Sequence, residues 1–417
     1  MKNALLISHG FPPMLAPESI LMGRMVKYLP KFGWEGTVVT AHENYFAEKI
    51  DMDLLNLIPE RFVIQKTKSF ERGFALKILH RLFPCLLHLP DTKILWFPFA
   101  YKIGSSLLRE GKFDLIYSHA CSFTSNLVGL KLKEKTGLPW IAHFSDPWVD
   151  NPYHTYNRLT KAVNFTLENS VMQNADAIVF VSDETMQLVM CKYPPEIRNK
   201  SYVIPHCYDP ELFRTLVKQR NDRFTLTYTG SFYGARSPVN LLRALKNILT
   251  SHHDINNEMN VKIVGNLHKS YVKMVHEFGI DKIVSIIGRV SYFKSLEYIL
   301  NADVLLLIDA PSKDISVFLP LKLIDYIGSK NPILGITPIK GASASLIRKV
   351  NGIVVDPDDI NGIERAILLL YSKFKSKNLS DYSYGDDAIE IYKPTNTTES
   401  LSKLFDQVSQ NNKREKL

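Results

Sequence analysis

The feature that most constrains the fold of this chain is the alternation of short apolar segments with segments of helical periodicity. The apolar segments, which predict strands, are 4–8, 36–41, 114–118, 140–144, 177–182, 224–229, 261–264, 283–287, 304–308, 332–336 and 352–355. The helical segments between them include 19–32, 122–135, 157–173, 237–250, 291–301 and 322–328. Strands that alternate with helices predict an α/β protein whose parallel sheets are covered by helices on both faces.

The alternation pauses once, in a polar stretch near the middle of the chain that contains two prolines and several charged residues. We therefore expect an N-terminal domain over residues 1–207, a linker over 208–223 and a C-terminal domain over 224–378. Residues 379–417 are expected to form a helical segment that packs back towards the N-terminal domain. The apolar face of this segment, at helical spacing, would consist of Leu401, Leu404, Phe405 and Val408.

Composition excludes several classes of protein. Hydrophobic residues make up 45% of the chain and charged residues 22%, which is typical of globular proteins and excludes wholesale disorder. The four cysteines form no C-x-x-C pair, so we expect neither a disulfide scaffold nor a zinc ribbon, and a reducing compartment fits better. No signal peptide or long apolar run is evident, which predicts a cytoplasmic protein without a membrane-spanning helix.

The formal net charge of +9 favours an anionic partner. Residues 61–112 hold most of this excess, and an apolar stripe of period four runs through them at Phe74, Ile78, Leu82 and Leu86. Two interpretations stay open: a basic amphipathic helix on an anionic membrane surface, which would place the protein on the inner face of the cell membrane, or a core-facing helix with a solvated basic side. No recognised motif accompanies the charge, so nucleic acid is not expected as a partner.

Several signature motifs are absent. The chain has no G-x-G-x-x-G after a strand, no G-x-x-x-x-G-K-[ST], no H-E-x-x-H and no G-x-S-x-G. No carboxylate cluster indicates a metal site. In open parallel sheets ligands bind beyond the carboxyl ends of the strands, so the loops after the predicted strands are the places to look for chemistry.

Three places near such ends have features of an anion-binding site. Gly10 follows the first strand and lets a ligand approach the backbone, although a plain strand-to-helix turn is an equal alternative. Gly230 and Arg236 precede a predicted helix, where backbone N–H groups and a guanidinium suit phosphate; the alternative is a solvated loop arginine. Lys322 and Asp325 share one helix face, either as a surface ion pair or as groups for a phosphate and a ribose diol.

The chain also resembles a known family over nearly its whole length. The motifs that carry the resemblance include FPP at 11–13, DLIYSH at 114–119, DPW at 146–148, YTGS at 228–231, IGRV at 287–290, ADVLL at 302–306 and KLIDY at 322–326. In order and spacing they resemble the retaining, metal-independent glycosyltransferases of family 4, which have the GT-B fold. The resemblance implies two doubly wound Rossmann-like domains that face each other across a cleft, with no cofactor and no metal.

The resemblance also implies a substrate class and roles for donor-side residues. The donor would be a nucleotide-sugar, with UDP favoured and GDP the alternative, and the acceptor a lipid-linked or cell-envelope polysaccharide glycan. Arg236 and Lys322 would stabilise the leaving diphosphate as catalytic residues, and Asp325 would bind the ribose hydroxyls. Further donor contacts are implied for Gly10, Gly230, Ser231, Gly288, Arg289 and Val290.

On the acceptor side, the resemblance implies that His119 faces the donor sugar or the acceptor, whereas a buried, hydrogen-bonded histidine is the alternative. Arg24 and Asp146 would shape the acceptor pocket. Two departures from the family pattern are Val317, where a glutamate is common, and Ser231, where a cation is common. Two other functions therefore stay open: a nucleotide-sugar epimerase on the same scaffold and a non-catalytic partner subunit.

Overall fold

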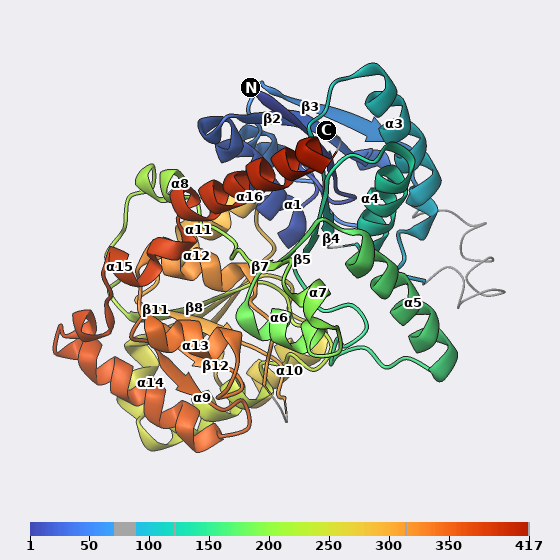
Figure 1. Ribbon diagram of the computed structural model, residues 1–417. Coiled ribbons are helices and arrows are strands. Elements are labelled where there is room, and N and C mark those ends of the chain that lie inside the picture. The colour runs from blue at the N-terminus through green and yellow to red at the C-terminus, as the bar shows by residue number, and fades with distance from the viewer. Residues whose placement is uncertain (71–88, 121, 313–314, 416–417) are drawn as a thin grey trace. The chain divides into compact units, whose positions relative to one another are not determined.

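Two parallel β-sheets organise the chain, one in each of two structural units (Figure 1). Unit 1 consists of residues 1–207 and 394–417, and unit 2 of residues 208–393. The computed structural model describes residues 1–70, 89–120, 122–312 and 315–415. Parallel sheets flanked by helices confirm the α/β class that the alternating sequence pattern predicts.

The sheet of unit 1 has seven strands in the order β3-β2-β1-β4-β5-β6-β7. Its strands are β1 (Lys2–Ile7), β2 (Trp34–Ala41), β3 (Phe62–Thr67), β4 (Leu115–Ala120), β5 (Trp140–Phe144), β6 (Ala177–Phe180) and β7 (Ser201–Val203). Its α-helices are α1 (Pro17–Tyr28), α3 (Phe97–Glu110), α4 (Phe123–Thr136), α5 (Arg158–Asn174), α6 (Asp183–Met190), α7 (Pro195–Arg198) and α16 (Pro394–Glu415). Short 3₁₀ helices are η1 (Leu29–Phe32), η2 (Glu43–Tyr45), η3 (Met52–Leu57) and η5 (Ile94–Trp96).

The sheet of unit 2 has six strands in the order β10-β9-β8-β11-β12-β13. Its strands are β8 (Phe224–Thr229), β9 (Met259–Val264), β10 (Val284–Gly288), β11 (Val304–Ile308), β12 (Ile333–Ile336) and β13 (Ile353–Val355). Its α-helices are α8 (Pro210–Arg214), α9 (Val239–Ser251), α10 (Lys269–Glu277), α11 (Tyr292–Leu300), α12 (Leu321–Ser329), α13 (Ala342–Lys349), α14 (Ile360–Lys375) and α15 (Asp386–Ile389). Its 3₁₀ helices are η6 (His253–Asn257), η7 (Leu379–Tyr382) and η8 (Glu390–Tyr392).

The two strands that the sequence pattern does not predict, β3 and β7, both lie at the edges of the unit 1 sheet. In β3 the side chain of Phe62 is buried while Val63 is 59% exposed, so the strand alternates instead of forming an apolar run. β7 is three residues long and only partly buried. Because an edge strand has one open side, the criterion of continuous apolarity fails there.

Helix α16 packs on unit 1 through the apolar face that helical spacing predicts. Its residues Leu401, Leu404, Phe405 and Val408 are all less than 7% exposed. The ring of Phe405 meets the ring of Trp34 edge-on, with centroids 5.1 Å apart, and lies 5.4 Å from the ring of Tyr117. Next to it, the Asp406 carboxylate accepts hydrogen bonds from the indole of Trp34 (2.9 Å) and the ammonium of Lys2 (2.7 Å). Aromatic packing and a charged anchor thus fix the C-terminal helix.

An aspartate just before β4, β6 and β11 fixes the neighbouring strand in the sheet. In each case the carboxylate accepts a hydrogen bond from a backbone N–H near the start of that neighbour, at 3.1, 2.7 and 2.8 Å. The three donor–acceptor pairs are Asn3 with Asp114, Trp140 with Asp176, and Thr225 with Asp303. These bonds stabilise the register at the amino ends of the strands.

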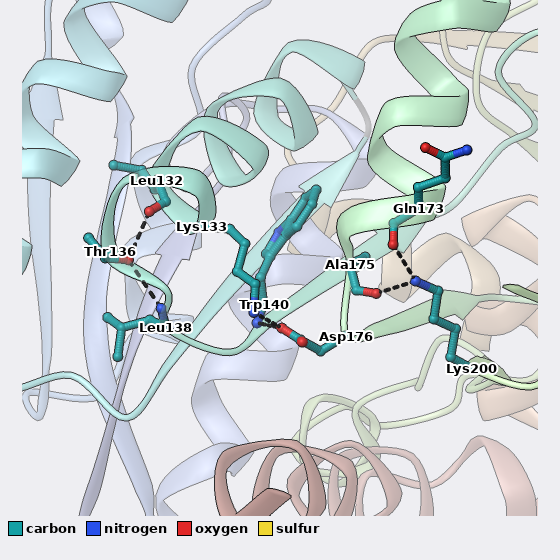
Figure 2. Close-up of polar contacts among 9 residues, drawn as sticks. All are labelled: Leu132, Lys133, Thr136, Leu138, Trp140, Gln173, Ala175, Asp176 and Lys200. Atoms are coloured by element: carbon teal, nitrogen blue, oxygen red, sulfur yellow. Dashed lines mark hydrogen bonds and ion pairs between the residues drawn. The ribbon is translucent and has the colours of Figure 1, made fainter. Parts of the chain in front are cut away.

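Figure 2 shows this arrangement around Asp176, whose carboxylate also binds the ammonium of Lys133 at 2.7 Å. Nearby, Lys200 donates hydrogen bonds to the carbonyl oxygens of Gln173 (2.7 Å) and Ala175 (2.6 Å), at the C-terminal end of α5. A cation at this position satisfies carbonyls that the helix leaves without partners and complements the negative end of its dipole.

Candidate functional site

Each sheet has one point at which its strand order reverses, between β1 and β4 in unit 1 and between β8 and β11 in unit 2. Crevices at such points, beyond the carboxyl ends of the strands, are where open parallel sheets bind ligands. In unit 1, Gly10 follows β1 and His119 lies at the end of β4. In unit 2, Gly230 and Arg236 lie on the loop that follows β8. These four residues thus lie near the two reversal points.

In unit 2, the carboxyl ends of three adjacent strands, β8, β9 and β10, carry Gly230, Gly265 and Gly288. All three have positive φ angles, of 114°, 144° and 78°. Their backbones are in direct contact, because a Cβ atom on Gly265 would lie 1.9 Å from the carbonyl oxygen of Gly230. The Gly265 N–H also donates to the Gly288 carbonyl at 2.8 Å. This edge of the sheet therefore presents backbone, which a ligand can approach closely.

Arg236 lies beside this edge with its guanidinium held by two groups. One nitrogen, Nη2, is 3.1 Å from Oδ1 of Asp309, and Nη1 donates to the hydroxyl of Tyr233 at 3.2 Å. The guanidinium carbon also lies 4.9 Å from the centroid of the Tyr233 ring. The side chain is 12% exposed, so Arg236 is not a solvated loop arginine.

Lys322, on the first turn of α12, also lies close to Gly230. A Cβ atom on Gly230 would lie 2.5 Å from its ammonium nitrogen, so the glycine is required for this approach. The ammonium donates to the hydroxyl of Tyr228 at 2.9 Å and lies 4.1 Å from the centroid of that ring. Burial and then the charge of Arg236 hold the pKa of Lys322 well below its ordinary value, while Asp309 opposes them. An anion bound here would raise this pKa again.

Asp325 lies one turn further along α12 and is 4% exposed. Its carboxylate accepts a hydrogen bond from the hydroxyl of Tyr292 at 3.3 Å. The ammonium of Lys322 donates to the hydroxyl of Tyr228, and the buried Asp325 does not lie on the protein surface. The next residue, Tyr326, accepts the backbone N–H of Thr229 at 2.9 Å and so ties α12 to the end of β8.

The remaining predicted residues of unit 2 lie around this cluster. The carbonyl oxygen of Ser231 accepts a hydrogen bond from the Tyr228 hydroxyl at 3.2 Å. Arg289 is exposed and Val290 half-buried, directly after β10. Val317 is 4% exposed, so an apolar side chain is buried at the position where the family pattern has a carboxylate.

At the reversal point of unit 1, three buried histidines lie next to one another. His119 on β4 and His143 on β5 are register partners, and their ring centroids are 4.5 Å apart. His206 stacks on His143 at 5.9 Å. The hydroxyl of Tyr117 lies 2.5 Å from Nδ1 of His143. These four side chains line a cavity of about 40 Å³.

Burial lowers the pKa of each of these histidines. The pKa of His119 falls to about 4 and that of His206 to about 3. The pKa of His143 is lowered by burial and by the neighbouring histidines. Nδ1 of His119 and Nε2 of His143 are buried and have no hydrogen-bond partner among the described residues. Neutral rings with unused nitrogens can donate to or accept from a hydroxyl-bearing ligand.

The other predicted residues of unit 1 take different places. Arg24 is fully buried and donates from Nη1 to the backbone oxygen of Cys207 at 2.8 Å, beside the histidine cavity. Asp146 follows β5, and burial together with the charge of Glu18 raises its pKa to about 6. Gly10 packs so closely that a Cβ atom would lie 2.6 Å from the Glu18 side chain. Gly10 and Asp146 are therefore neighbours of the same carboxylate.

Sequence reasoning missed several residues of these clusters: Gly265, Asp309, His143 and His206. A signal existed for Asp309, because it directly follows a correctly predicted strand and so lies where a ligand is expected. No sequence signal pairs His119 with His143, because their proximity depends on the register of β4 with β5.

Two findings concern metals and membranes. Within the described ranges, no group of three or more His, Cys, Asp or Glu side chains is arranged to hold a metal ion. No helix in the described part of the chain is long and apolar enough to cross a membrane. The apolar stripe through Phe74, Ile78, Leu82 and Leu86 lies outside the described residues.

Two family models match the chain. The model described as Glycosyltransferase Family 4 matches residues 21–212, and the model described as Glycosyl transferases group 1 matches residues 211–385. A search of curated proteins gives no match.

Solved structures share the fold. HepE of Anabaena in complex with UDP is 14% identical, with a TM-score of 0.66, and the match covers 98% of this chain and 100% of HepE. Sucrose-phosphate synthase of Thermosynechococcus elongatus is 15% identical, with a TM-score of 0.70 over 98% and 99% of the two chains. The lipopolysaccharide outer core galactosyltransferase WaaB is 16% identical, with a TM-score of 0.57 over 100% of both.

Proposed function

The chain belongs to the family 4-like glycosyltransferases of the GT-B fold, and we propose that it moves a sugar from a nucleoside-diphosphate donor to a lipid-linked or cell-envelope polysaccharide acceptor. The observation that carries this proposal is the pair of cations beside the glycine edge of unit 2. Arg236 and Lys322 lie near a backbone that a ligand can approach, at the strand-order reversal. A UDP-linked donor is favoured because the similar HepE structure contains UDP.

The chemistry requires stabilisation of a diphosphate as negative charge develops on it. When the bond between the anomeric carbon and the phosphate oxygen breaks, the guanidinium of Arg236 and the ammonium of Lys322 offer preorganised positive charge to the leaving group. We propose that no metal is needed for this step, since the two side chains supply the charge. The bound dianion would also raise the pKa of Lys322 back towards its ordinary value.

The other roles follow from the proposed donor site. The carboxylate of Asp325 would accept hydrogen bonds from the ribose hydroxyls, and the backbone at Gly288 and Arg289 would bind the base. We propose a reaction that retains the anomeric configuration: the acceptor oxygen bonds to the anomeric carbon on the face that the diphosphate leaves. The acceptor proton passes to the departing phosphate oxygen, so no protein base is required.

In unit 1, we propose that the histidine cluster and Asp146 serve the sugar or the acceptor. The unused nitrogens of His119 and His143 suit hydroxyl groups, which can donate and accept. Asp146, whose pKa is raised to about 6, would bind such a hydroxyl by a hydrogen bond.

A peripheral place on an anionic membrane surface, at the cytoplasmic face, is part of the proposal. In residues 61–112 the described side chains of Arg61, Lys68, Lys102, Arg109 and Lys112 are exposed. By contrast, Lys66 and Lys93 are already paired with Glu43 and Glu48. Exposed cations gain from anionic lipid, roughly 1 kcal/mol each near the surface.

The buried Val317 favours one competing function, a non-catalytic partner subunit, because it removes a carboxylate from the donor site. Incubation of the protein with UDP-glucose and other UDP- and GDP-sugars, with and without a polyprenyl-phosphate-sugar acceptor, separates the possibilities. Sugar transfer that depends on acceptor, and that falls at least tenfold in Arg236→Ala, is the expected result. A changed sugar nucleotide without acceptor would indicate an epimerase, and no turnover with any donor would favour the non-catalytic subunit.

A further inference from the structure

Asp309 is a buried carboxylate in the middle of the proposed phosphate site. It directly follows β11, and its backbone N–H donates to the carbonyl oxygen of Ile336 at 3.0 Å, so its position is fixed by the sheet. One carboxylate oxygen binds the guanidinium of Arg236 at 3.1 Å, and the other accepts the hydroxyl of Thr337 at 3.1 Å. The residue is 4% exposed.

The charges of the site without a ligand explain why a carboxylate is there. Arg236 and Lys322 repel each other, and each loses hydration when partly buried. Asp309 provides a compensating negative charge in low-dielectric surroundings, where unpaired charges are costly.

A bound nucleoside diphosphate changes this balance. It brings at least two negative charges to the same two cations and so makes the carboxylate redundant. Asp309 cannot move away, because the strand and Thr337 hold it. A phosphate held by Arg236, which Asp309 contacts directly, would then be repelled by the like charge of this carboxylate.

We propose that Asp309 is an internal counter-anion that stabilises the unliganded site and opposes nucleoside-diphosphate binding, and thereby sets the donor affinity and the ease of product release. This inference rests on the proposed function, because it assumes that Arg236 and Lys322 bind the diphosphate. It makes Asp309 a determinant of affinity, distinct from a residue that merely orients Arg236. A residue that only orients Arg236 would strengthen nucleotide binding, whereas a counter-anion weakens nucleotide binding.

The test is calorimetric titration of UDP and GDP into wild type and Asp309→Asn, with melting curves of both proteins without ligand. The substitution keeps the size of the side chain and removes its charge. The inference predicts that the nucleotide binds on the order of tenfold more tightly to Asp309→Asn. It also predicts that the unliganded variant melts at a lower temperature than wild type and that KM for the donor falls.

The matched control is Asp303→Asn, the same substitution just before the other end of β11. Asp303 accepts the backbone N–H of Thr225 at 2.8 Å and the side-chain amide of Asn221 at 3.1 Å. Its loss is expected to lower the melting temperature without changing nucleotide affinity. If Asp309→Asn does not fold, its effect can be measured in a background without the Arg236 charge. The double variant Arg236→Gln/Asp309→Asn is then expected to bind the nucleotide more tightly than Arg236→Gln does.

The outcomes separate the two claims. A wild-type protein that binds neither UDP nor GDP overturns the proposed function, and the role of Asp309 with it. A wild type that binds while the Asp309→Asn variant binds equally or more weakly overturns the counter-anion alone. Tighter binding in both Asp309→Asn and Asp303→Asn also overturns it, because the effect would then not belong to the site.

Discussion

The close approach of Lys322 to Gly230 makes the substitution Gly230→Ala a direct test of the proposed phosphate site. The added Cβ would lie 2.5 Å from the ammonium nitrogen and 3.0 Å from the carbon next to it. Because this is the far end of a flexible side chain, the ammonium would move instead of the backbone. It would leave the hydroxyl and the ring face of Tyr228, which now hold it at 2.9 Å and 4.1 Å.

Two effects set the size of the loss in stability. A φ of 114° is unfavourable for an L-residue and costs roughly 1–3 kcal/mol. Loss of the hydrogen bond to Tyr228 adds about 1 kcal/mol. The free energy of unfolding should therefore fall by about 2–4 kcal/mol. A displaced ammonium would also lose its contact with a phosphate, which is worth about 1.5–3 kcal/mol, or roughly tenfold to more than a hundredfold in affinity.

Gly234→Ala is the matched control, because Gly234 lies in the same loop, also has a positive φ of 57°, and has no heavy atom within 4 Å of an added Cβ. This change should cost about 1–2 kcal/mol and leave UDP affinity unchanged. The assay is calorimetric titration of UDP into each folded variant, with melting temperature as the measure of stability. If Gly230→Ala binds UDP as tightly as Gly234→Ala does, the assignment of Lys322 to a phosphate is refuted.

Two further predictions concern unit 1. The pKa of His119 is lowered from about 6.5 to about 4, so the folded state prefers the neutral ring. Its contribution to the free energy of unfolding is therefore complete above pH 6.5. That contribution falls by about 3 kcal/mol as the pH drops towards 4. His119→Gln should therefore lose less stability than wild type over this pH range, and equal losses would contradict the assignment. Asp146 changes stability in the opposite direction, but it is present in both proteins and so does not affect the comparison. The membrane proposal predicts that the double variant Lys102→Glu/Arg109→Glu is released from liposomes that contain phosphatidylglycerol. The control Arg243→Glu/Lys269→Glu changes the net charge by the same amount at exposed sites of unit 2 and should stay bound. Equal release by both pairs would show that only net charge matters.

Much of the fold could be predicted because the physical rule that governs it is local. A strand buried on both faces must be apolar throughout, and the runs at 140–144, 224–229 and 304–308 match β5, β8 and β11 residue for residue. Edge strands escape this rule. In β3, Val63 points to solvent, so the strand does not need a continuous apolar run and a search for such runs does not predict it.

The site was only partly predictable, for a related reason. Residues on one loop or one helix turn, such as Arg236 or the pair Lys322 and Asp325, can be recognised from their spacing. The partners that give them their properties come from other strands. Asp309 is 73 residues from Arg236 in the sequence, and only the pairing of β8 with β11 brings the two together.

The histidine cluster shows the same limit more sharply. The sequence identifies His119 as a residue at a strand end, but the pKa of that histidine depends on burial that no local pattern gives. His143 becomes its neighbour through the register of β4 with β5, and His206 through the fold of the chain after β7. A buried cluster of this kind is a property of the tertiary structure, whereas a phosphate loop is largely a property of the sequence.

Titration of wild type with UDP and GDP without metal, repeated with Lys322→Met, measures whether the carboxyl edge of the unit 2 sheet binds a diphosphate. The methionine is unbranched and one atom shorter than the lysine, and it removes the charge. The account predicts that one of the two nucleotides binds wild type clearly better than the other, and that its affinity falls at least about tenfold in Lys322→Met. Absence of binding to folded wild type, or equal binding to the variant, would contradict a diphosphate site at the carboxyl edge of the unit 2 sheet.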